Sequence, residues 1–158
     1  MRRASDISLT VKGQVQGDFK GGSKKKDRTN AFDVWDTNYK VVSPRDVVSG
    51  HATGRRQHNP LVVYTEVEGG AIPMCLTALT KNENLTKVEM KFWRSDAKAA
   101  KQTNYFTITL ENAVLSEFEV FCDEDGRPNA RLAFTFGKIT LTWMDGNITS
   151  TDDWHGTQ

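Results

Sequence analysis

Residues 72–81 read IPMCLTALTK and form the segment whose pattern predicts an α-helix, around which the rest of the chain is organised. An apolar stripe at the i, i+3, i+4 and i+7 spacing of a helix face comprises Ile72, Cys75, Leu76 and Leu79. Pro73 fits the first helical turn, where the missing N–H is not needed. A helix of about three turns is not stable alone in water. We therefore expect it to pack against a sheet formed by the remaining chain.

On both sides of this segment, apolar and polar residues alternate with the period of two that is typical of half-buried strands. These runs cover residues 7–11, 32–42, 61–67, 87–92, 105–110, 114–120, 132–136 and 139–143. At 158 residues the chain is long enough for one domain with a sizeable core. The pattern predicts a single, mainly β domain over residues 1–158, an antiparallel β-barrel with one helix.

The last strand pattern changes phase between Phe136 and Ile139. Apolar residues occupy even positions up to Phe136 and odd positions from Ile139 onward. A strand does not switch faces without an extra residue or a break, so we predict a β-bulge or a sharp corner at Gly137-Lys138. At Glu111-Asn112 the sequence predicts either a tight corner or one continuous bent strand.

The segment Ser43–Pro60 is predicted to be an extended loop. It has a proline near each end, two glycines and many Arg, His and Asn residues. Loops of this length without regular structure are binding loops or disordered segments. The adjacent guanidinium groups of Arg55 and Arg56 favour pairing with carboxylates on another surface, although the sequence alone leaves a merely flexible loop open.

Composition indicates an ordinary soluble protein and excludes several functional classes. The net charge is +1 with 26% charged residues, so no electrostatic partner is indicated. There is no transmembrane span, and the basic N-terminus lacks the apolar segment of a signal peptide. The pattern around Cys75 and Cys122 favours two buried thiols over a disulfide.

No catalytic constellation is present in the sequence. Glu117 and Glu119 share one strand face, but a solvated outer face explains them better than a carboxylate pair. His51 and His58 lack partners at metal-ligand spacing, so no metal or cofactor is predicted.

The run at residues 24–28, KKKDR, is either a phosphate-binding patch or a solvated loop. With no interleaved aromatic residue and a balanced total charge, we interpret it as a solvated loop and predict no nucleic-acid binding.

Two non-enzymatic classes remain, a ligand-binding barrel and an assembly protein. Trp35 and Trp93 lie on the faces opposite to the main apolar sets of their strands, which indicates a second buried surface. We interpret this surface as an interface with another chain. Self-pairing of strand edges in a closed ring is one solution for an open sheet.

The sequence resembles the haemolysin-coregulated proteins (Hcp), tube subunits of bacterial type VI secretion systems. The resemblance covers nearly the whole chain in one order. It is carried by Ser43-Pro44-Arg45-Asp46, Ser49-Gly50, Thr53-Gly54-Arg55-Arg56, His58-Asn59-Pro60-Leu61-Val62, Asn82-Glu83-Asn84-Leu85, Phe92-Trp93-Arg94, Tyr105-Phe106-Thr107-Ile108, Phe134-Thr135-Phe136-Gly137-Lys138-Ile139, Thr142-Trp143, Asp145-Gly146, Ile148-Thr149 and Asp152-Asp153-Trp154. The start of the helix departs from the family pattern, because Gly69-Gly70-Ala71-Ile72 replaces Ser-Thr before the proline and predicts a weak N-cap.

The resemblance implies two packed β-sheets closing into a barrel, one flanking helix, and a homohexameric ring that stacks into a tube. It further implies a contractile sheath, a VgrG-type spike and effector proteins in the lumen as partners, with no membrane insertion. With this family in view, we expect the loop at 43–60 to stack on the next ring through Arg45, Asp46, His51, Arg55, Arg56 and His58. We expect Trp35, Trp93 and Trp154 at subunit interfaces, and a C-terminal tail over residues 150–158.

The expected localisation follows from the same resemblance. The chain is expected in the bacterial cytoplasm before firing and then outside the cell or in a target cell, without a signal peptide. Phage tail-tube proteins share the architecture, so a tail-tube protein of a phage-like contractile particle is the alternative. Neighbouring genes for a sheath and a secretion ATPase, or for a phage head, distinguish the two.

Overall fold

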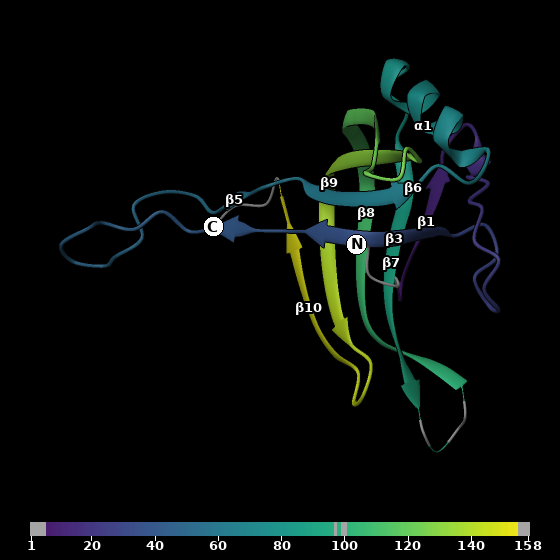
Figure 1. Cartoon of the computed structure of the whole chain (residues 1–158). Helices are drawn as coiled ribbons and strands as arrows, with labels where there is room; N and C mark the ends of the chain where they lie inside the picture. The colour runs from purple at the N-terminus through teal and green to yellow at the C-terminus, as the bar shows by residue number, and fades with distance from the viewer. Residues whose placement is uncertain (1–5, 97, 99–100, 155–158) are drawn as a thin grey trace.

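The computed structural model describes residues 6–96, 98 and 101–154, and within them the chain forms ten strands and one helix (Figure 1). In chain order the elements are β1 Ile7–Gly13, β2 Gly17–Asp18, β3 Phe32–Asn38, β4 Val41–Val42, β5 Gln57–His58, β6 Leu61–Glu66, α1 Ala71–Thr80, β7 Leu85–Asp96, β8 Lys101–Cys122, β9 Pro128–Trp143 and β10 Ile148–Asp153. The prediction of a mainly β fold with one helix is confirmed.

Strand pairing closes the main sheet on itself. The strands follow the order β10-β9-β6-β3-β1-β7-β8, and β8 also pairs with β9. All of these pairings are antiparallel. In Figure 1, β3 and β6 cross in front of β7 and β8, and side chains from both layers form one apolar core. The closure leaves β10 as an edge strand, paired only with β9.

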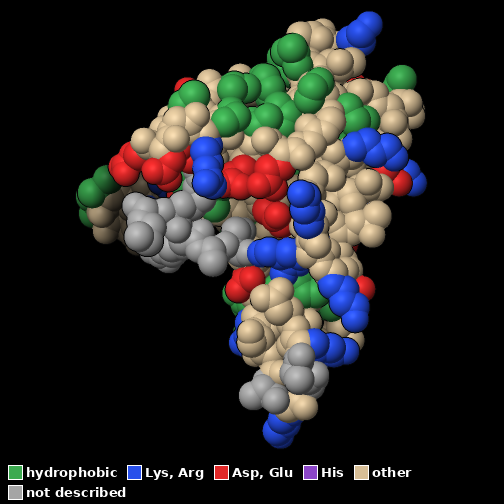
Figure 2. All heavy atoms as spheres, turned by 45° about the vertical axis from the view of Figure 1, so that its right-hand side comes forward, with side chains coloured by type: hydrophobic (Ala, Val, Ile, Leu, Met, Phe, Trp, Pro, Cys, Tyr) green, Lys and Arg blue, Asp and Glu red, His purple; other side chains and the backbone are tan. Residues whose placement is uncertain are grey.

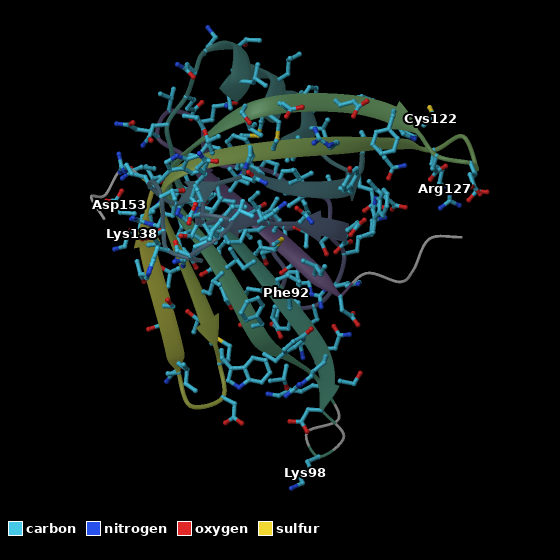
Figure 3. The ribbon with its side chains drawn as sticks, turned by 90° about the vertical axis from the view of Figure 1, so that its left-hand side faces the viewer. Phe92, Lys98, Cys122, Arg127, Lys138 and Asp153 are labelled. Carbon is cyan, nitrogen blue, oxygen red and sulfur yellow. The ribbon has the colours of Figure 1, made fainter. Side chains whose placement is uncertain are left out.

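The predicted change of phase at Gly137-Lys138 lies inside an unbroken strand. The β8–β9 register runs from Leu110↔Ile139 to Ala113↔Phe136 without a shift, so of the two predicted alternatives the β-bulge was wrong and the strand bends at a corner instead. Figure 3 shows β9 turning through a corner beside Lys138. At this corner β9 exchanges its second partner, from β6 on one side to β10 on the other.

The corner keeps its register because both strands change phase together. In β8 the buried residues switch from Ile108 and Leu110 to Ala113 and Leu115. Asn112, opposite Gly137, adopts φ +53°, a left-handed conformation that Asn tolerates better than most residues. The bulge in this ladder lies between Leu115 and Glu117 instead. The sequence at 111–112 therefore encodes a continuous bent strand, the second of the two predicted alternatives.

Helix α1 starts and ends one residue before the predicted bounds, and Ile72 and Cys75 of the predicted stripe are buried. Its buried residues are Ala71, Ile72, Cys75 and Ala78. Leu76, placed on the buried face by the spacing argument, is 50% exposed. Ala71 and Ala78 complete the inner face, and Leu79 is partly buried against the core. Figure 2 shows hydrophobic side chains at the surface at the end of the molecule that carries α1.

The N-terminus of α1 is weakly capped. Gly70 is the N-cap residue and makes no side-chain capping bond, as predicted for this weak start.

Cys75 is buried, and burial raises the pKa of its thiol to about 12. Cys122 is exposed, so the prediction of two buried thiols was wrong for this residue. It ends β8 at the far tip of the β8–β9 hairpin, beyond the core (Figure 3).

The position of the core on β9 gives a testable stability difference. Leu132 is fully buried, whereas Val120 on the adjacent strand is 54% exposed. Leu132→Ala should lower the free energy of unfolding by roughly 2–5 kcal/mol, because it leaves a cavity in the barrel. Val120→Ala should change it by no more than about 0.5 kcal/mol. Urea unfolding of both variants checks this, and equal effects would contradict the assignment of the inner face.

Candidate functional site

Residues 41–58 leave the barrel as a long two-stranded arm (Figure 1). At its base, β4 pairs with β5 through Val41↔His58 and Val42↔Gln57. Farther out, a single bridge joins Arg45 to Ala52. These short ladders are the regular structure described in the arm, which agrees with the prediction that Ser43–Pro60 forms an extended loop.

The tip of the arm presents apolar side chains to solvent. The Asp46 carboxylate accepts a hydrogen bond from the Ser49 amide at 2.8 Å, and Gly50 turns the chain back with φ +77°. Bonds from Ser49 lower the pKa of Asp46, which stabilises its charged form. This turn holds Val47 and Val48 outward, 99% and 94% exposed. Apolar side chains at the end of a projecting arm favour contact with another surface.

The base of the arm is fastened to the barrel through a buried histidine. His58 is 6% exposed, and its Nδ1 lies 2.7 Å from the Tyr39 hydroxyl. Its Nε2 lies 2.6 Å from Oδ2 of Asp152 on β10. The imidazole also packs against the Trp154 ring at a centroid distance of 5.3 Å. Segments far apart in sequence are thus joined at one point.

Arg56 completes this contact, which we call the anchor (Tyr39, Arg56, His58, Asp152 and Trp154). The Arg56 Nε donates to Asp152 Oδ2, and Nη2 donates to the carbonyl of Asp153 at 3.0 Å. The hydrogen bond from Arg56, followed by that from His58, holds the pKa of Asp152 below its usual value. The anchor therefore contains a charge-assisted network that fixes the direction in which the arm leaves the barrel.

The structure divides the six residues predicted for ring stacking into two groups. Arg45, Asp46, His51 and Arg55 lie exposed along the arm, as a docking role requires. Arg56 and His58 instead take part in the anchor. The burial of His58 leaves no surface for direct contact with another ring, so its role is to position the arm. Stacking through the four exposed residues stays a prediction.

The three tryptophans predicted at subunit interfaces are all partly buried within the chain. Trp35 donates its indole N–H to Asn129 Oδ1 at 3.0 Å, and Trp93 donates to Ser8 Oγ at 2.9 Å. Trp154 packs edge-on against Phe136 in the anchor. Each indole thus has an internal role. Whether their exposed parts contact a second subunit stays a prediction.

Sequence reasoning missed two features of the arm. The anchor depends on Asp152 and Tyr39, which lie far from the arm in sequence, and no local pattern links them to His58. The exposed Val47 and Val48 were also missed, although two β-branched apolar residues inside a Gly- and Arg-rich loop were a usable signal.

Other candidate chemistry finds little support in the described part of the chain. Glu117 and Glu119 are exposed, and Glu117 pairs with Arg131 at 3.0 Å, in agreement with a solvated outer face. Within residues 6–96, 98 and 101–154, no group of three or more His, Cys, Asp or Glu side chains is placed to hold a metal ion. No described helix has the length and apolar character needed to cross a membrane. The C-terminal tail predicted over residues 150–158 belongs to strand β10 as far as Asp153. His155, the third histidine, and residues 156–158 lie outside the described residues.

Comparison with known proteins gives consistent matches over nearly the whole chain. A family model described as "Type VI secretion system effector, Hcp" matches residues 9–143. A protein of Pseudomonas aeruginosa named "Major exported protein" is 34% identical over 153 residues, covering 92% of this chain and 88% of that protein. A structure of Hcp1 from Escherichia coli matches with a TM-score of 0.86 at 26% identity, covering 96% of this chain and 99% of that one. The secreted protein Hcp3 of Pseudomonas aeruginosa matches with a TM-score of 0.77 at 27% identity, covering 94% and 99%.

The anchor predicts that the charge of Asp152 stabilises the fold. Asp152→Asn removes the charge shared by two hydrogen-bond donors and should lower the free energy of unfolding by about 1 kcal/mol at neutral pH. Ser150→Ala, two positions along the same strand and exposed, is the matched control and should change it by no more than about 0.5 kcal/mol. Urea unfolding at pH 7 measures both.

The same contact has a defined pH dependence. Because the pKa of Asp152 is lower in the folded chain than in the unfolded chain, its contribution is complete above the unfolded value of about 4. The contribution is lost as the pH falls through the folded value. The stability difference between parent and Asp152→Asn should therefore shrink on acidification below pH about 4. A difference that grows in acid would contradict the anchor.

Proposed function

Since this chain belongs to the Hcp family of type VI secretion system proteins, we propose that it is a structural subunit of the secretion tube. The observation that carries the proposal is the family match over residues 9–143, together with the full-length likeness to Hcp1. In this role the chain assembles into hexameric rings, and the rings stack into a tube. The function is mechanical, and we propose no catalytic activity and no required metal or cofactor.

The ring contact is proposed to use strand edges. β10 is an edge strand of the main sheet and carries Ile148, which is 68% exposed. An unprotected edge presents backbone donors and acceptors that pair with another chain unless they are covered. A closed ring removes such edges from solvent, because each subunit covers the next. A stable contact of this kind buries about 800 Å² on each partner.

A second surface suits the wall of the tube. Across β7, β8, β9 and β10, polar residues line up in rows, one of which pairs Thr109 with Thr140 and Thr140 with Thr151. The Thr140 and Thr151 hydroxyls lie 3.0 Å apart. Glu89 on the same face lies 3.6 and 3.7 Å from Lys87 and Lys91. We propose that this polar face borders the lumen, in which effector proteins travel.

Stacking is proposed to use the arm. Its exposed tip, Val47 and Val48, and its exposed charges, Arg45 and Arg55, reach beyond the barrel and dock on the next ring. Burying one valine is worth roughly 1.5–3 kcal/mol before the costs of association. With six arms in each ring, a net gain of about 1 kcal/mol per arm sums to about 6 kcal/mol, some four decades in the stacking constant.

The remaining partners follow from membership of the family. We propose a VgrG-type spike at the tip of the tube and a contractile sheath around it. The protein would act in the bacterial cytoplasm first and outside the cell after firing, in keeping with the name of its relative in Pseudomonas aeruginosa. The family match favours type VI secretion over the phage tail-tube alternative.

Solution mass tests the ring. Six copies of the 17.7-kDa chain predict a particle of about 106 kDa. Light scattering of the full-length protein at moderate salt should report this mass. A monomer at high micromolar concentration would contradict the proposed ring.

Charged substitutions at the arm tip test stacking separately from ring formation. Val47→Asp with Val48→Asp should leave the hexamer mass unchanged and shorten stacks at least tenfold, because six arms then bring like charges to one interface. The control Val15→Asp changes a valine that is 84% exposed elsewhere and should stack like the parent. Sedimentation of the stacks measures both. If the arm variant stacks like the parent, or if it no longer forms hexamers, the proposed role of the arm in stacking is contradicted.

A further inference from the structure

The basic segment at residues 24–28 is not wholly solvated, because its last residue turns inward. Arg28 is 3% exposed, whereas Lys24, Lys25 and Lys26 are exposed. The interpretation of the whole run as a solvated loop was therefore wrong for Arg28. Figure 2 shows Lys and Arg side chains distributed with acidic ones over the side of the molecule that carries this loop.

Arg28 lines a pocket of about 320 Å³ between this loop and the turn end of the β7–β8 hairpin. The pocket is lined by Lys25, Lys26, Asp27, Arg28, Trp93, Lys101 and Gln102. Four of these side chains are cationic and one is acidic. The volume lies at the small end of the range typical of small-molecule sites.

The guanidinium of Arg28 is held in place but incompletely bonded. Its Nη2 donates to Gln102 Oε1 at 2.6 Å, and its Cζ lies 4.8 Å from the centre of the Trp93 ring. Among the described residues, Nη1 has no hydrogen-bond partner, although it is buried. Buried polar nitrogens are nearly always bonded, so this one indicates a missing acceptor.

The charges around Arg28 leave room for an anion. Burial lowers the pKa of Arg28, while Asp33 and Asp6 oppose that shift. Asp6 also accepts a hydrogen bond from Gln102 at 2.9 Å and lies 3.9 Å from the Lys25 ammonium. These carboxylates offset part of the positive charge, but neither supplies an acceptor to Nη1. Arginine remains charged throughout, so the pocket keeps a fixed cationic fork beside the side chains of Lys25, Lys26 and Lys101.

We propose that this pocket binds a small phosphate-bearing anion, with Arg28 as the inner ligand and Lys25, Lys26 and Lys101 around it. A phosphate group carries several acceptor oxygens and a charge of about −1.5 to −2, which matches a guanidinium fork with several ammonium groups. A carboxylate offers two acceptor oxygens, fewer than a phosphate offers to a pocket lined by four cationic side chains. The aromatic residue that the local sequence lacks is supplied by Trp93 from β7. This site goes beyond the proposed assembly role and does not depend on it.

Titration calorimetry on the full-length protein tests the proposal, with inorganic phosphate and pyrophosphate as probes at constant ionic strength. We expect saturable binding at one site per chain, with pyrophosphate tighter than phosphate. Lys25→Gln with Lys26→Gln should weaken binding about tenfold or more, because two charge-assisted contacts are lost. The matched control Lys24→Gln changes the adjacent lysine, which does not line the pocket, and should stay within about twofold of the parent.

The variant Arg28→Lys and tryptophan fluorescence provide a second, independent test of anion binding. Arg28→Lys keeps the charge but removes the fork, and should abolish the preference for pyrophosphate and the associated change in tryptophan fluorescence. If that variant does not fold, the lysine pair decides. The absence of saturable binding overturns the proposal, as does equal weakening by Lys24→Gln. The proposal is also overturned if phosphate binds only as the oligomer dissociates, which light scattering would show. That outcome assigns the pocket to a carboxylate of a second copy.

Discussion

The bent ladder between β8 and β9 is the constraint on which the rest of the structure depends. These strands pair from Phe106↔Trp143 to Cys122↔Pro128 and join β8, the last strand of the order, back to β9, so the barrel closes through them. Because the β8–β9 ladder runs through both layers of the barrel, it has to bend while the two strands keep their register. Asn112 and Gly137 lie opposite one another and change the phase of both strands at once, so apolar side chains face the core on each side of the corner.

The corner also determines how the arm is held. The end of β10 reaches it through Asp153↔Lys138, and the Trp154 amide donates to the Gly137 carbonyl at 2.8 Å. Asp152, next to this point, accepts the bonds of Arg56 and His58 at the base of the arm. The core, the edge strand and the projecting arm are therefore coupled through one region. This coupling explains how a segment with little regular structure leaves the barrel in one direction.

Residues with strong periodicity could be predicted from sequence, and residues defined by distant partners could not. The strands and α1 follow alternation and helical spacing, but that spacing put Leu76 inside and did not show that Ala71 and Ala78 face the core. The phase change at Phe136 was visible, whereas its matching change at Asn112 was not, since the register between strands was unknown. Arg28 looked solvated because Trp93 and Gln102, its neighbours in space, lie far away in sequence. The anchor was missed for the same reason.

The central proposal is that the closed barrel, with its one open edge and its projecting arm, assembles into rings. Electron microscopy of the purified full-length protein, with three-dimensional reconstruction, tests this most directly. The account predicts a six-fold ring with β10 inside the contact between neighbouring subunits and all six arms projecting from the same face. A reconstruction with β10 exposed to solvent, or with arms folded back on their own barrels, would contradict it.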